Sequence, residues 1–388
     1  MKSLAIIFFS LFYLSSYSQQ YSKKWTNLDY ADDGKNYHML DIYLPKIAKS
    51  SYPVIIYIYG SAWFSDNSKG ADMNTVGAAL LNAGYAVVTP NHRSSSDSLF
   101  PAQIHDIKAA IRYVRANCTA YNLDTSFIGI SGSSSGGHLA ALAGTSCGVV
   151  DYTYDSITTN IEGKLGENTN FSSKVHAVCD WFGPTDLLLM DSCRGSMAYA
   201  EGKSPEEALV GCSKKNCRSK FVFINPITYI DPSDPPLLIF HGDADNVVPY
   251  CESQLLYNAL QAAGVSSEFI IAPGGQHYTG THTDANFKKM ITFFNSISKN
   301  DITSSIPLPS NDDKNLISLI SLNNELKIKG KDITCFLRYD IINMSGSVIN
   351  QKKLTKDRID ISFLKEGVYM LKLYNKDFSE ISFKFIKS

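Results

Sequence analysis

Residues 129–140 read GISGSSSGGHLA, with three serines in a row between glycines. The stretch contains the pattern G-x-S-x-G centred on Ser134, with Gly132 and Gly136 in the outer positions. It follows an apolar, strand-like run at 127–132 and precedes a helix-like stretch, which is the setting of a nucleophile elbow. Glycine is needed in that strained turn because larger side chains two positions from its centre would collide with neighbouring elements. The pattern therefore predicts that Ser134 is a nucleophile.

Of the three serines, only Ser134 has a glycine both two positions before it and two positions after it. A pattern centred on Ser133 would need glycine at positions 131 and 135, and one centred on Ser135 would need it at 133 and 137. A glycine- and serine-rich turn without chemistry is the alternative, because G-x-S-x-G also arises by chance. A serine nucleophile needs a base and an acid elsewhere in the chain, which decides between the two interpretations.

Apolar strands alternate with helix-like stretches on both sides of the turn. Two antiparallel-looking segments come first, at 26–30 and 38–44. Strands are then expected at 53–60, 85–91, 127–132, 175–183, 236–242 and 267–274, and helices at 101–117, from 135, at 251–263 and at 284–297. This alternation predicts the α/β class, with a mostly parallel sheet flanked by helices. Ligands of such sheets bind at the carboxyl ends of the strands, so candidate site residues are sought just after each strand.

The base is expected in the loop after the last strand. Residues 273–277 read PGGQH, and the glycines allow the ring of His277 to swing over the sheet. His282 is the nearest competitor. His138 lies one turn into the helix after the elbow and is expected to be a packed or hydrogen-bonded helical residue. His92 and its neighbour Arg93 follow another strand and are expected to brace the floor of the site.

The acid is expected before the histidine in chain order. Residues 241–249 read HGDADNVVP directly after a strand, and Asp245 is the best placed carboxylate in that loop. Asp243 is expected to support the turn, because Asp readily hydrogen-bonds its own backbone. Asp186 follows an earlier strand and is the second choice.

The oxyanion of an acyl transfer needs two backbone donors. One is expected to be the N–H of Ser135, at the start of the helix after the nucleophile. The other is expected from the loop after the first long strand, which reads YGSAW at 59–63, through the N–H of Ser61 or Ala62. Taken alone, this loop also fits an ordinary strand-to-helix turn.

Composition limits the class of protein and its location. The chain has 388 residues, 44% apolar residues and a net charge of −1, which allows more than one domain and does not indicate nucleic-acid binding. Residues 1–18 have one lysine, an apolar run and a small polar end, which predicts a secretory signal peptide and export. The apolar run is too short to span a bilayer, so we expect no transmembrane segment in the mature chain.

Cysteine usage agrees with export. The chain has eight cysteines, and Cys193, Cys212 and Cys217 are candidates for disulfide bonds, although the sequence does not fix the pairing. A zinc site at Cys212-x4-Cys217 is the competing interpretation, but no second pair or nearby histidine completes a ligand set. We expect no metal and no organic cofactor, and nothing in the sequence indicates an oligomeric state.

The pattern changes near residue 300. Residues 300–315 contain Pro307, Pro309 and several Ser, Asn and Asp residues, which predicts a linker. Short alternating segments at 325–328, 336–343, 359–363, 368–373 and 380–386 then predict a small all-β sandwich domain over 316–388.

Over residues 20–299 the chain resembles the α/β-hydrolase family, on the elbow, the 59–63 loop, Asp245 and His277. The stretches YGSAWFSDNSKG, GSSSGGHLAAL, DWFGPTDLL and HGDADNVVPY are similar to the secreted carbohydrate esterases of Bacteroidetes, the acetyl xylan and feruloyl esterase group. The chain departs from the wider esterase pattern HGGGW, since Tyr59 replaces the histidine and serine and alanine replace two glycines. The oxyanion donors are backbone groups, so this departure does not remove them.

This resemblance implies a secreted serine esterase that hydrolyses acetyl or feruloyl esters of plant cell-wall polysaccharide. A cap-like insertion is expected at about 148–224, where these enzymes carry such segments. Trp63, Trp181 and Phe182 lie beside strand ends and are expected to bind the substrate, although buried aromatic residues are more often core. A general short-chain carboxylesterase, a peptidase and an inactive surface binding protein are the alternatives, because fold does not fix function.

The last domain resembles the C-terminal sorting domain of the type IX secretion system. The resemblance rests on YDIINMSG at 339–346, on IDI at 359–361, on LKEGVY at 364–369 and on the closing KFIK. It implies passage through the periplasm, type IX secretion machinery as a partner, and release or display at the cell surface. A carbohydrate-binding β-sandwich is the alternative, but no exposed aromatic cluster stands out.

Overall fold

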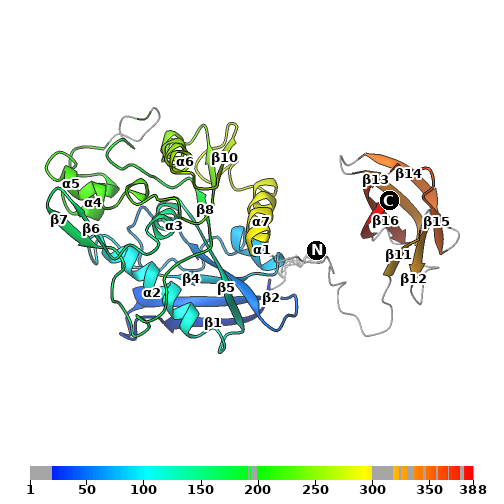
Figure 1. Ribbon diagram of the computed structural model, residues 1–388, viewed down its shortest axis with the longest axis horizontal. Helices are drawn as coiled ribbons and strands as arrows, with labels where there is room; N and C mark the ends of the chain where they lie inside the picture. Colours follow the sequence, from blue (N-terminus) through cyan, green and yellow to red (C-terminus); the bar gives the residue numbers. More distant parts are fainter. Residues whose placement is uncertain are drawn as a thin grey trace, which may run out of the picture. The chain divides into compact units, whose positions relative to one another are not determined.

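The computed structural model describes residues 20–190, 193 and 199–298, and then 318–322, 325–329, 336–343, 347–354, 357–365, 367–375 and 380–387. The expected signal peptide at 1–18 and linker at 300–315 lie outside these residues. The chain divides into two compact units, one up to Ser305 and one from Ile306, which are treated separately below (Figure 1).

The first unit is built on one eight-stranded sheet with the order β1-β2-β4-β3-β5-β8-β9-β10. β1, β2 and β4 pair antiparallel, and the strands from β4 to β10 pair parallel. The strands are β1 Tyr21–Asp29, β2 Met39–Pro45, β3 Tyr52–Ile58, β4 Ala86–Pro90, β5 Leu123–Ser133, β8 Ala177–Trp181, β9 Leu237–Gly242 and β10 Ser267–Ala272. The predicted mostly parallel sheet, with two antiparallel strands first, is confirmed.

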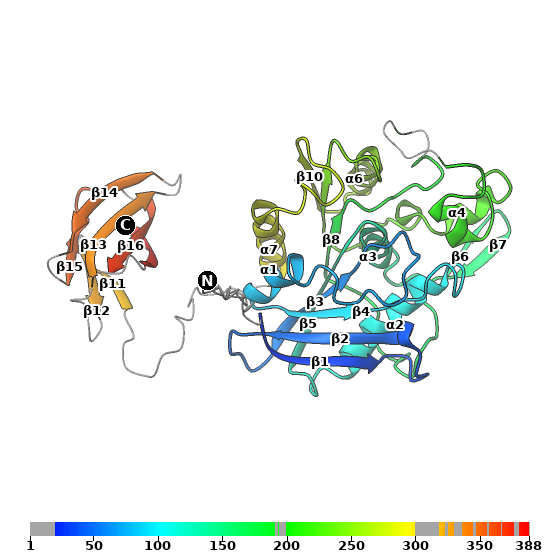
Figure 2. The same cartoon turned by 180° about the vertical axis from the view of Figure 1, so that it is seen from behind.

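Helices cover both faces of this sheet, and Figure 2 shows them from behind. They are α1 Val76–Asn82, α2 Ala102–Ala116, α3 Ser135–Thr145, α4 Pro205–Val210, α5 Arg218–Val222, α6 Cys251–Ala263 and α7 Asp284–Ser298, with 3-10 turns η1 Asn36–His38 and η3 Pro226–Thr228. α2, α3 and α6 contribute to one apolar core, and α1 and α7 contribute to the other. In the part of the chain that the structure describes, no helix is long and apolar enough to cross a membrane.

Strand β3 shows why the sheet lies between two cores. Val54, Ile56 and Ile58 point into the core with α2, α3 and α6, whereas Ile55 and Tyr57 point into the core with α1 and α7. Alternation of side chains along a strand produces this division, so a strand covered on both faces reads as a continuous apolar run. Each such fully buried aliphatic side chain stabilises the fold by roughly 1.5–3 kcal/mol.

The expected insertion at 148–224 is not one segment. Strand β8 of the main sheet lies inside that range, so the extra residues form two separate segments, one on each side of β8. The first segment contains a hairpin of β6 Asp151–Tyr154 and β7 Ile157–Asn160. Two ion pairs hold this segment against α2. Nζ of Lys108 lies 3.1 Å from Oε2 of Glu162, and Nη1 of Arg112 lies 2.7 Å from Oε1 of the same residue.

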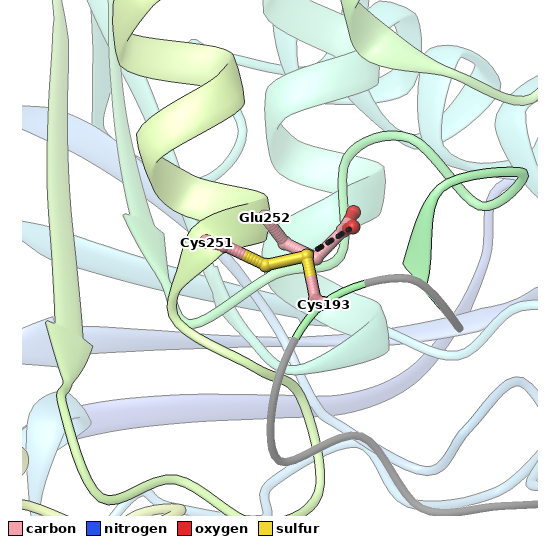
Figure 3. A group of neighbouring side chains, drawn as sticks. All are labelled: Cys193, Cys251 and Glu252. Atoms are coloured by element: carbon pink, nitrogen blue, oxygen red, sulfur yellow. Dashed lines mark hydrogen bonds between the residues drawn. A yellow bond between two sulfur atoms is a disulfide. The ribbon is translucent and has the colours of Figure 1, made fainter.

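The disulfide candidates form two bonds, Cys212–Cys217 and Cys193–Cys251. All three cysteines predicted as candidates are therefore paired, and the zinc interpretation of Cys212-x4-Cys217 is replaced by a disulfide. Among the described residues, the one group with metal-ligand spacing is Cys193, Cys251 and Glu252, whose two cysteines form the second bond. Figure 3 shows this group at the start of α6.

The second unit consists of two antiparallel sheets with the orders β11-β12-β15 and β14-β13-β16-β17. The strands are β11 Ser318–Leu322, β12 Glu325–Lys329, β13 Phe336–Asn343, β14 Val348–Lys353, β15 Arg358–Asp360, β16 Gly367–Asn375 and β17 Glu380–Lys387. Leu326 and Ile359 from the first sheet share one apolar core with Ile341 and Leu371 from the second. The two sheets therefore pack as a sandwich, as predicted.

Candidate active site

Ser134 occupies the turn between β5 and α3. Its backbone has φ 56° and ψ −125°, a strained conformation that costs roughly 1–3 kcal/mol for a residue other than glycine. A Cβ on Gly132 would collide with the backbone oxygen of Gly136, and a Cβ on Gly136 would collide with that of Ile58. The turn predicted from the two glycines is therefore present, centred on Ser134.

The elbow lies where four parallel strands end. In the strand register, Ser133 of β5 is opposite Trp181 of β8, and Trp181 is opposite Phe240 of β9. Phe240 is opposite Ile270 of β10. The loops that carry the predicted acid and base thus begin at the same edge of the sheet as the elbow, and the backbone oxygen of Trp181 accepts a hydrogen bond of 2.9 Å from the Ser134 N–H.

Asp245 and His277 form a close pair. The Oδ2 atom of Asp245 lies 2.8 Å from Nδ1 of His277, and the carboxylate is fully buried while the imidazole is 14% exposed. Burial by itself would raise the pKa of Asp245, but hydrogen bonds from His241, His277 and the backbone of Val247 hold that pKa well below its usual range. Asp245 is thus a carboxylate throughout the neutral range, and it fixes the proton of His277 on Nδ1, which leaves Nε2 able to accept a proton.

The two rival carboxylates make other contacts. Asp243 Oδ1 accepts a hydrogen bond of 2.6 Å from the Gly274 N–H, which supports the turn after β10. Asp186 Oδ1 accepts from the Leu188 N–H and from Nδ2 of Asn225. No contact among the described residues joins either carboxylate to His277.

His138 is buried and His282 is partly buried, and both are bonded elsewhere. Nε2 of His138 lies 2.6 Å from the backbone oxygen of Ile224, and burial lowers the pKa of His138 to about 4, so it is the packed helical residue that was predicted. Nε2 of His282 lies 3.1 Å from Oγ of Ser133, and burial, together with the nearby His277, lowers the pKa of His282 to about 3.

The 59–63 loop lies against Ser134. A Cβ on Gly60 would lie 2.9 Å from Cβ of Ser134. The next residues turn sharply, with φ 52° at Ala62 and φ 60° at Trp63. The N–H of Ser61, one of the expected oxyanion donors, already donates to Oγ of Ser135 at 2.8 Å.

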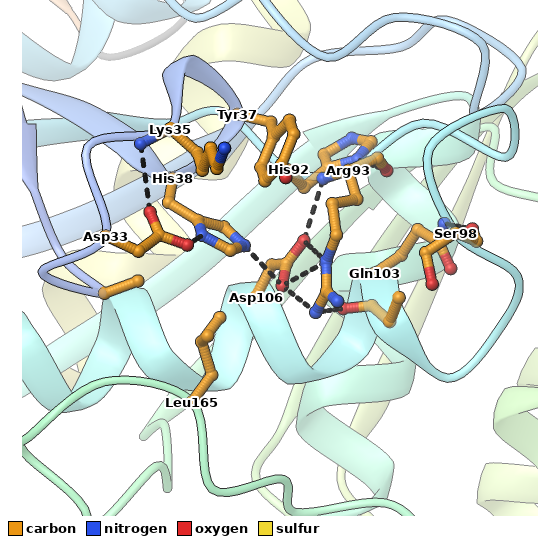
Figure 4. Close-up of polar contacts among 12 residues, drawn as sticks. Asp33, Lys35, Tyr37, His38, His92, Arg93, Ser98, Gln103, Asp106 and Leu165 are labelled. Atoms are coloured by element: carbon orange, nitrogen blue, oxygen red, sulfur yellow. Dashed lines mark hydrogen bonds and ion pairs between the residues drawn. The ribbon is translucent and has the colours of Figure 1, made fainter.

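A network of polar and charged side chains joins the segment after β4 to α2 and η1 (Figure 4). The ring of His92 stacks on that of Tyr59, with 4.9 Å between the ring centroids. The next residue, Arg93, donates hydrogen bonds from Nε and from its backbone N–H to the buried carboxylate of Asp106 on α2. Nε2 of His38 lies 3.3 Å from the same carboxylate. His92 thus contacts the 59–63 loop through Tyr59, and Arg93 ties the segment after β4 to α2, whereas their role at the floor of the site stays a prediction.

The aromatic residues predicted to bind substrate do not form an open wall. Trp181 and Phe182 are fully buried and Trp63 is 3% exposed. The indole of Trp181 stacks on Phe240 at 4.1 Å, and Phe182 packs against His277 at 4.6 Å. Trp181 ends β8, Phe182 directly follows it and Trp63 lies in the sharp turn of the 59–63 loop. Because all three side chains are buried, they are corrected to core and support positions.

Phe64, next to Trp63, is 52% exposed. It follows the sharp turn of the 59–63 loop, and no motif singled it out.

Two buried acidic residues near the site were also not predicted. Oε2 of Glu252 accepts hydrogen bonds from the N–H groups of Thr185 and Asp186, at 2.8 and 2.7 Å, and burial raises the pKa of Glu252 to about 7. Asp180 on β8 accepts from the Gly183 N–H at 2.9 Å, and burial raises its pKa to about 7. Neither lies in a recognisable motif, since Glu252 reads as an ordinary first-turn helical residue and Asp180 as part of a strand.

Comparison with known proteins identifies both units. Residues 40–260 match the family model BD-FAE, and residues 311–388 match that of the secretion system C-terminal sorting domain. A solved structure described as a truncated form of a carbohydrate esterase from gut microbiota is 48% identical, with a TM-score of 0.70, over 73% of this chain and 98% of that one.

Two further relatives extend the comparison. A bifunctional GH43-CE from Bacteroides eggerthii is 50% identical, with a TM-score of 0.68, over 71% of this chain and 35% of that one. Among curated proteins, Esterase LipQ of Mycobacterium tuberculosis is 27% identical over 67% of this chain. The chain spans 58% of the length of that relative.

The BD-FAE match covers more than half of the chain. The chain therefore belongs to the BD-FAE family and has the α/β-hydrolase fold, which confirms the resemblance drawn from the elbow and the strand-end loops.

Proposed function

We propose that this member of the BD-FAE family is a secreted serine esterase that removes acetyl or feruloyl groups from plant cell-wall polysaccharide through an acyl-enzyme. The observation that carries the proposal is the 2.8 Å pair of Asp245 and His277 at the sheet edge that also holds the strained Ser134. A nucleophile, an orienting acid and a base, in this chain order, are typical of α/β-hydrolases that carry out acyl transfer.

In the proposed mechanism, His277 takes the hydroxyl proton of Ser134 as Oγ attacks the ester carbonyl. Asp245 stabilises the imidazolium that forms and keeps its ring oriented. The imidazolium then gives its proton to the leaving alcohol, which departs from the tetrahedral intermediate. Water, deprotonated by the same histidine, attacks the acyl-enzyme and releases the acid, which regenerates Ser134.

Backbone amides supply the oxyanion donors in this proposal. The Ser135 N–H is at the first turn of α3 and has no intrahelical acceptor. Since the Ser61 N–H is occupied by the Ser135 hydroxyl, the Ala62 N–H is assigned as the second donor, in place of the earlier choice between the two. Loss of one such donor typically raises the barrier by about 3–4 kcal/mol.

The substrate class rests on two relatives that are about half identical to this chain, one described as a carbohydrate esterase and the other as a bifunctional GH43-CE. The exposed Phe64 beside the oxyanion loop offers an aromatic face to a sugar or a feruloyl ring. Trp63, Trp181 and Phe182 act in this account by supporting the base and the loop.

The test is hydrolysis of acetylated xylan and of methyl ferulate, measured side by side for the protein and for its Ser134→Ala variant. Release of acetate or ferulate that disappears in the variant supports the proposal and ranks the acyl groups. Hydrolysis of p-nitrophenyl acetate without release from either substrate leaves a general short-chain carboxylesterase. Cleavage of peptide amides instead would assign a peptidase.

The alternative to an enzyme is a surface binding protein that has the same fold but no catalytic activity. A fluorophosphonate probe, which reacts with activated serines, distinguishes the two. Absence of any labelling, together with retention on insoluble xylan, would replace the enzyme by the binding protein.

We further propose that the chain is exported to the periplasm by its signal peptide and delivered to the cell surface or medium by type IX secretion. The match of residues 311–388 to a sorting domain supports this route. Deletion of 311–388 in a host with that system is expected to trap an active hydrolase in the periplasm. Unimpaired surface delivery of the truncated chain would refute the sorting role.

A further inference from the structure

The two serines that flank Ser134 each hold a different loop of the site. Ser133 is fully buried and Ser135 is 2% exposed, so their side chains are enclosed by protein. Each hydroxyl nevertheless has a defined polar partner on another element, which is the condition under which a buried hydroxyl stabilises a specific geometry. This explains why the elbow carries three serines.

The Ser135 hydroxyl is bonded to the 59–63 loop. Its Oγ accepts the hydrogen bond of 2.8 Å from the Ser61 N–H, across 74 residues of sequence. The residue after Ser61 is Ala62, whose N–H is the proposed second donor. A hydrogen bond one residue away from that donor fixes its distance from the oxyanion, and catalytic donors must be held to within about 0.5 Å.

The Ser133 hydroxyl lies in a chain of hydrogen bonds that begins at Asp72. The Tyr57 hydroxyl donates to Oδ2 of Asp72 at 2.8 Å and lies 2.8 Å from Oγ of Ser133. A tyrosine hydroxyl has one hydrogen, so Ser133 must donate to Tyr57. The Ser133 hydrogen is then used, and Nε2 of His282, 3.1 Å away, must donate to Oγ of Ser133.

This chain of bonds ends in the loop that carries the base. The backbone N–H of His282 donates to the oxygen of Tyr278, the residue after His277, at 2.8 Å. The ring of Phe182 packs between the two histidines, with centroids 4.6 Å from His277 and 5.2 Å from His282. Movement of His282 therefore displaces both the loop and the ring against which His277 rests.

We propose that Ser133 and Ser135 are positioning residues, the first for the loop of His277 and the second for the oxyanion donor of the 59–63 loop. The inference rests on the proposed function, since it assigns the two residues to the same site. Neither hydroxyl touches the reacting atoms.

The test compares Ser133→Ala, Ser135→Ala and Tyr57→Phe in the full chain with p-nitrophenyl acetate. Active sites are counted by titration with the fluorophosphonate probe, so that turnover is expressed per reactive site. We expect kcat to fall about tenfold in each variant with KM within about twofold, because the geometry of the base and the oxyanion donors matters chiefly in the transition state. Ser133→Ala combined with Tyr57→Phe is expected to cost no more than either change alone, because both break one chain of bonds.

Thr145→Val is the matched control. Thr145 is fully buried at the end of α3, and its hydroxyl has no hydrogen-bond partner among the described residues, so its removal should leave turnover unchanged. Melting temperatures are recorded for all variants. A serine variant that melts earlier but turns over at the unsubstituted rate per titrated site has only a structural role, and that result overturns the proposal for that serine.

Failure of the proposed function gives a different result. In that case the unsubstituted protein neither reacts with the probe nor hydrolyses the ester, and both proposals are overturned together.

Discussion

Asp245 holds His277 through one hydrogen bond of 2.8 Å, and that carboxylate also accepts the backbone N–H groups of Val247 and Val248 on its other oxygen. The carboxylate is therefore fixed from both sides before it orients the imidazole. Asp186, Asp243 and Asp245 were the three candidates for the acid in the sequence. The structure gives only Asp245 a contact with His277 among the described residues.

Asp245→Asn is expected to lower kcat on the order of 10³–10⁴-fold, because a neutral amide favours the wrong tautomer of His277 and does not stabilise its imidazolium. Asp243→Asn is the matched control in the same loop and is expected to change kcat only a few-fold. Initial rates with p-nitrophenyl acetate measure both. A larger loss from Asp243→Asn or Asp186→Asn would reassign the acid.

Gly60→Ala is expected to abolish turnover while the protein stays folded. The new Cβ would lie 2.5 Å from the Tyr278 hydroxyl oxygen and 2.6 Å from the backbone oxygen of Ser133. The 59–63 loop must therefore move away from Ser134. Gly34→Ala serves as the control. Gly34 has φ 69° with no atom near its Cβ position, so this change should cost only about 1–2 kcal/mol of stability. Equal turnover in the two variants would contradict the placement of the loop.

The elbow could be predicted from sequence because glycine at 132 and 136 is a steric requirement that leaves a visible pattern. The parallel sheet was equally visible, since strands buried on both faces are continuous apolar runs. The burial of Trp181 and Phe182 was considered but not decided from the sequence, because an aromatic residue at a strand end can point into the core or into the site. Tyr57 read as one more apolar residue of β3, and only the tertiary fold brings its hydroxyl to Ser133.

Removal of the Cys193–Cys251 disulfide is expected to destabilise the first unit more than removal of Cys212–Cys217. The two bonds close segments of 58 and 5 residues, for which the loss of unfolded-state entropy corresponds to roughly 4 and roughly 2 kcal/mol. Urea unfolding of the two paired Cys→Ser variants measures the free energies. The opposite ranking would show that loop closure does not control the effect.

His38 is expected to make stability depend on pH. Burial would lower its pKa, but hydrogen bonds and charge from Asp106 and Asp33 outweigh burial and raise it. A raised pKa in the folded protein means that the stabilisation is fully present below the unfolded value of about 6.5 and is lost as pH rises through the folded value. The melting temperature should therefore fall as the pH rises above about 6.5.

His38→Gln provides the comparison for that titration. The variant lacks the ionisable ring, so its melting temperature should be lower at pH 6 and should change less as the pH rises above about 6.5. Identical pH profiles for the two proteins would exclude His38 as the source.

The extra segments around β8 show a further limit of sequence reasoning. Their polar composition marked residues 148–224 as an insertion, although the apolar strand at 177–181 belongs to the central sheet. The sequence did predict a strand at 175–183, but the insertion was drawn across that strand as one segment. The hydrogen-bond register to β5 and β9 is what separates the two segments.

The central claim is that Ser134 is the activated nucleophile, and the most direct measurement maps a fluorophosphonate adduct on the full chain by peptide mass spectrometry. We predict an adduct on Ser134 and no labelling of Ser134→Ala, whereas Ser133→Ala and Ser135→Ala still react. An adduct on either flanking serine, or labelling that survives Ser134→Ala, would contradict the account.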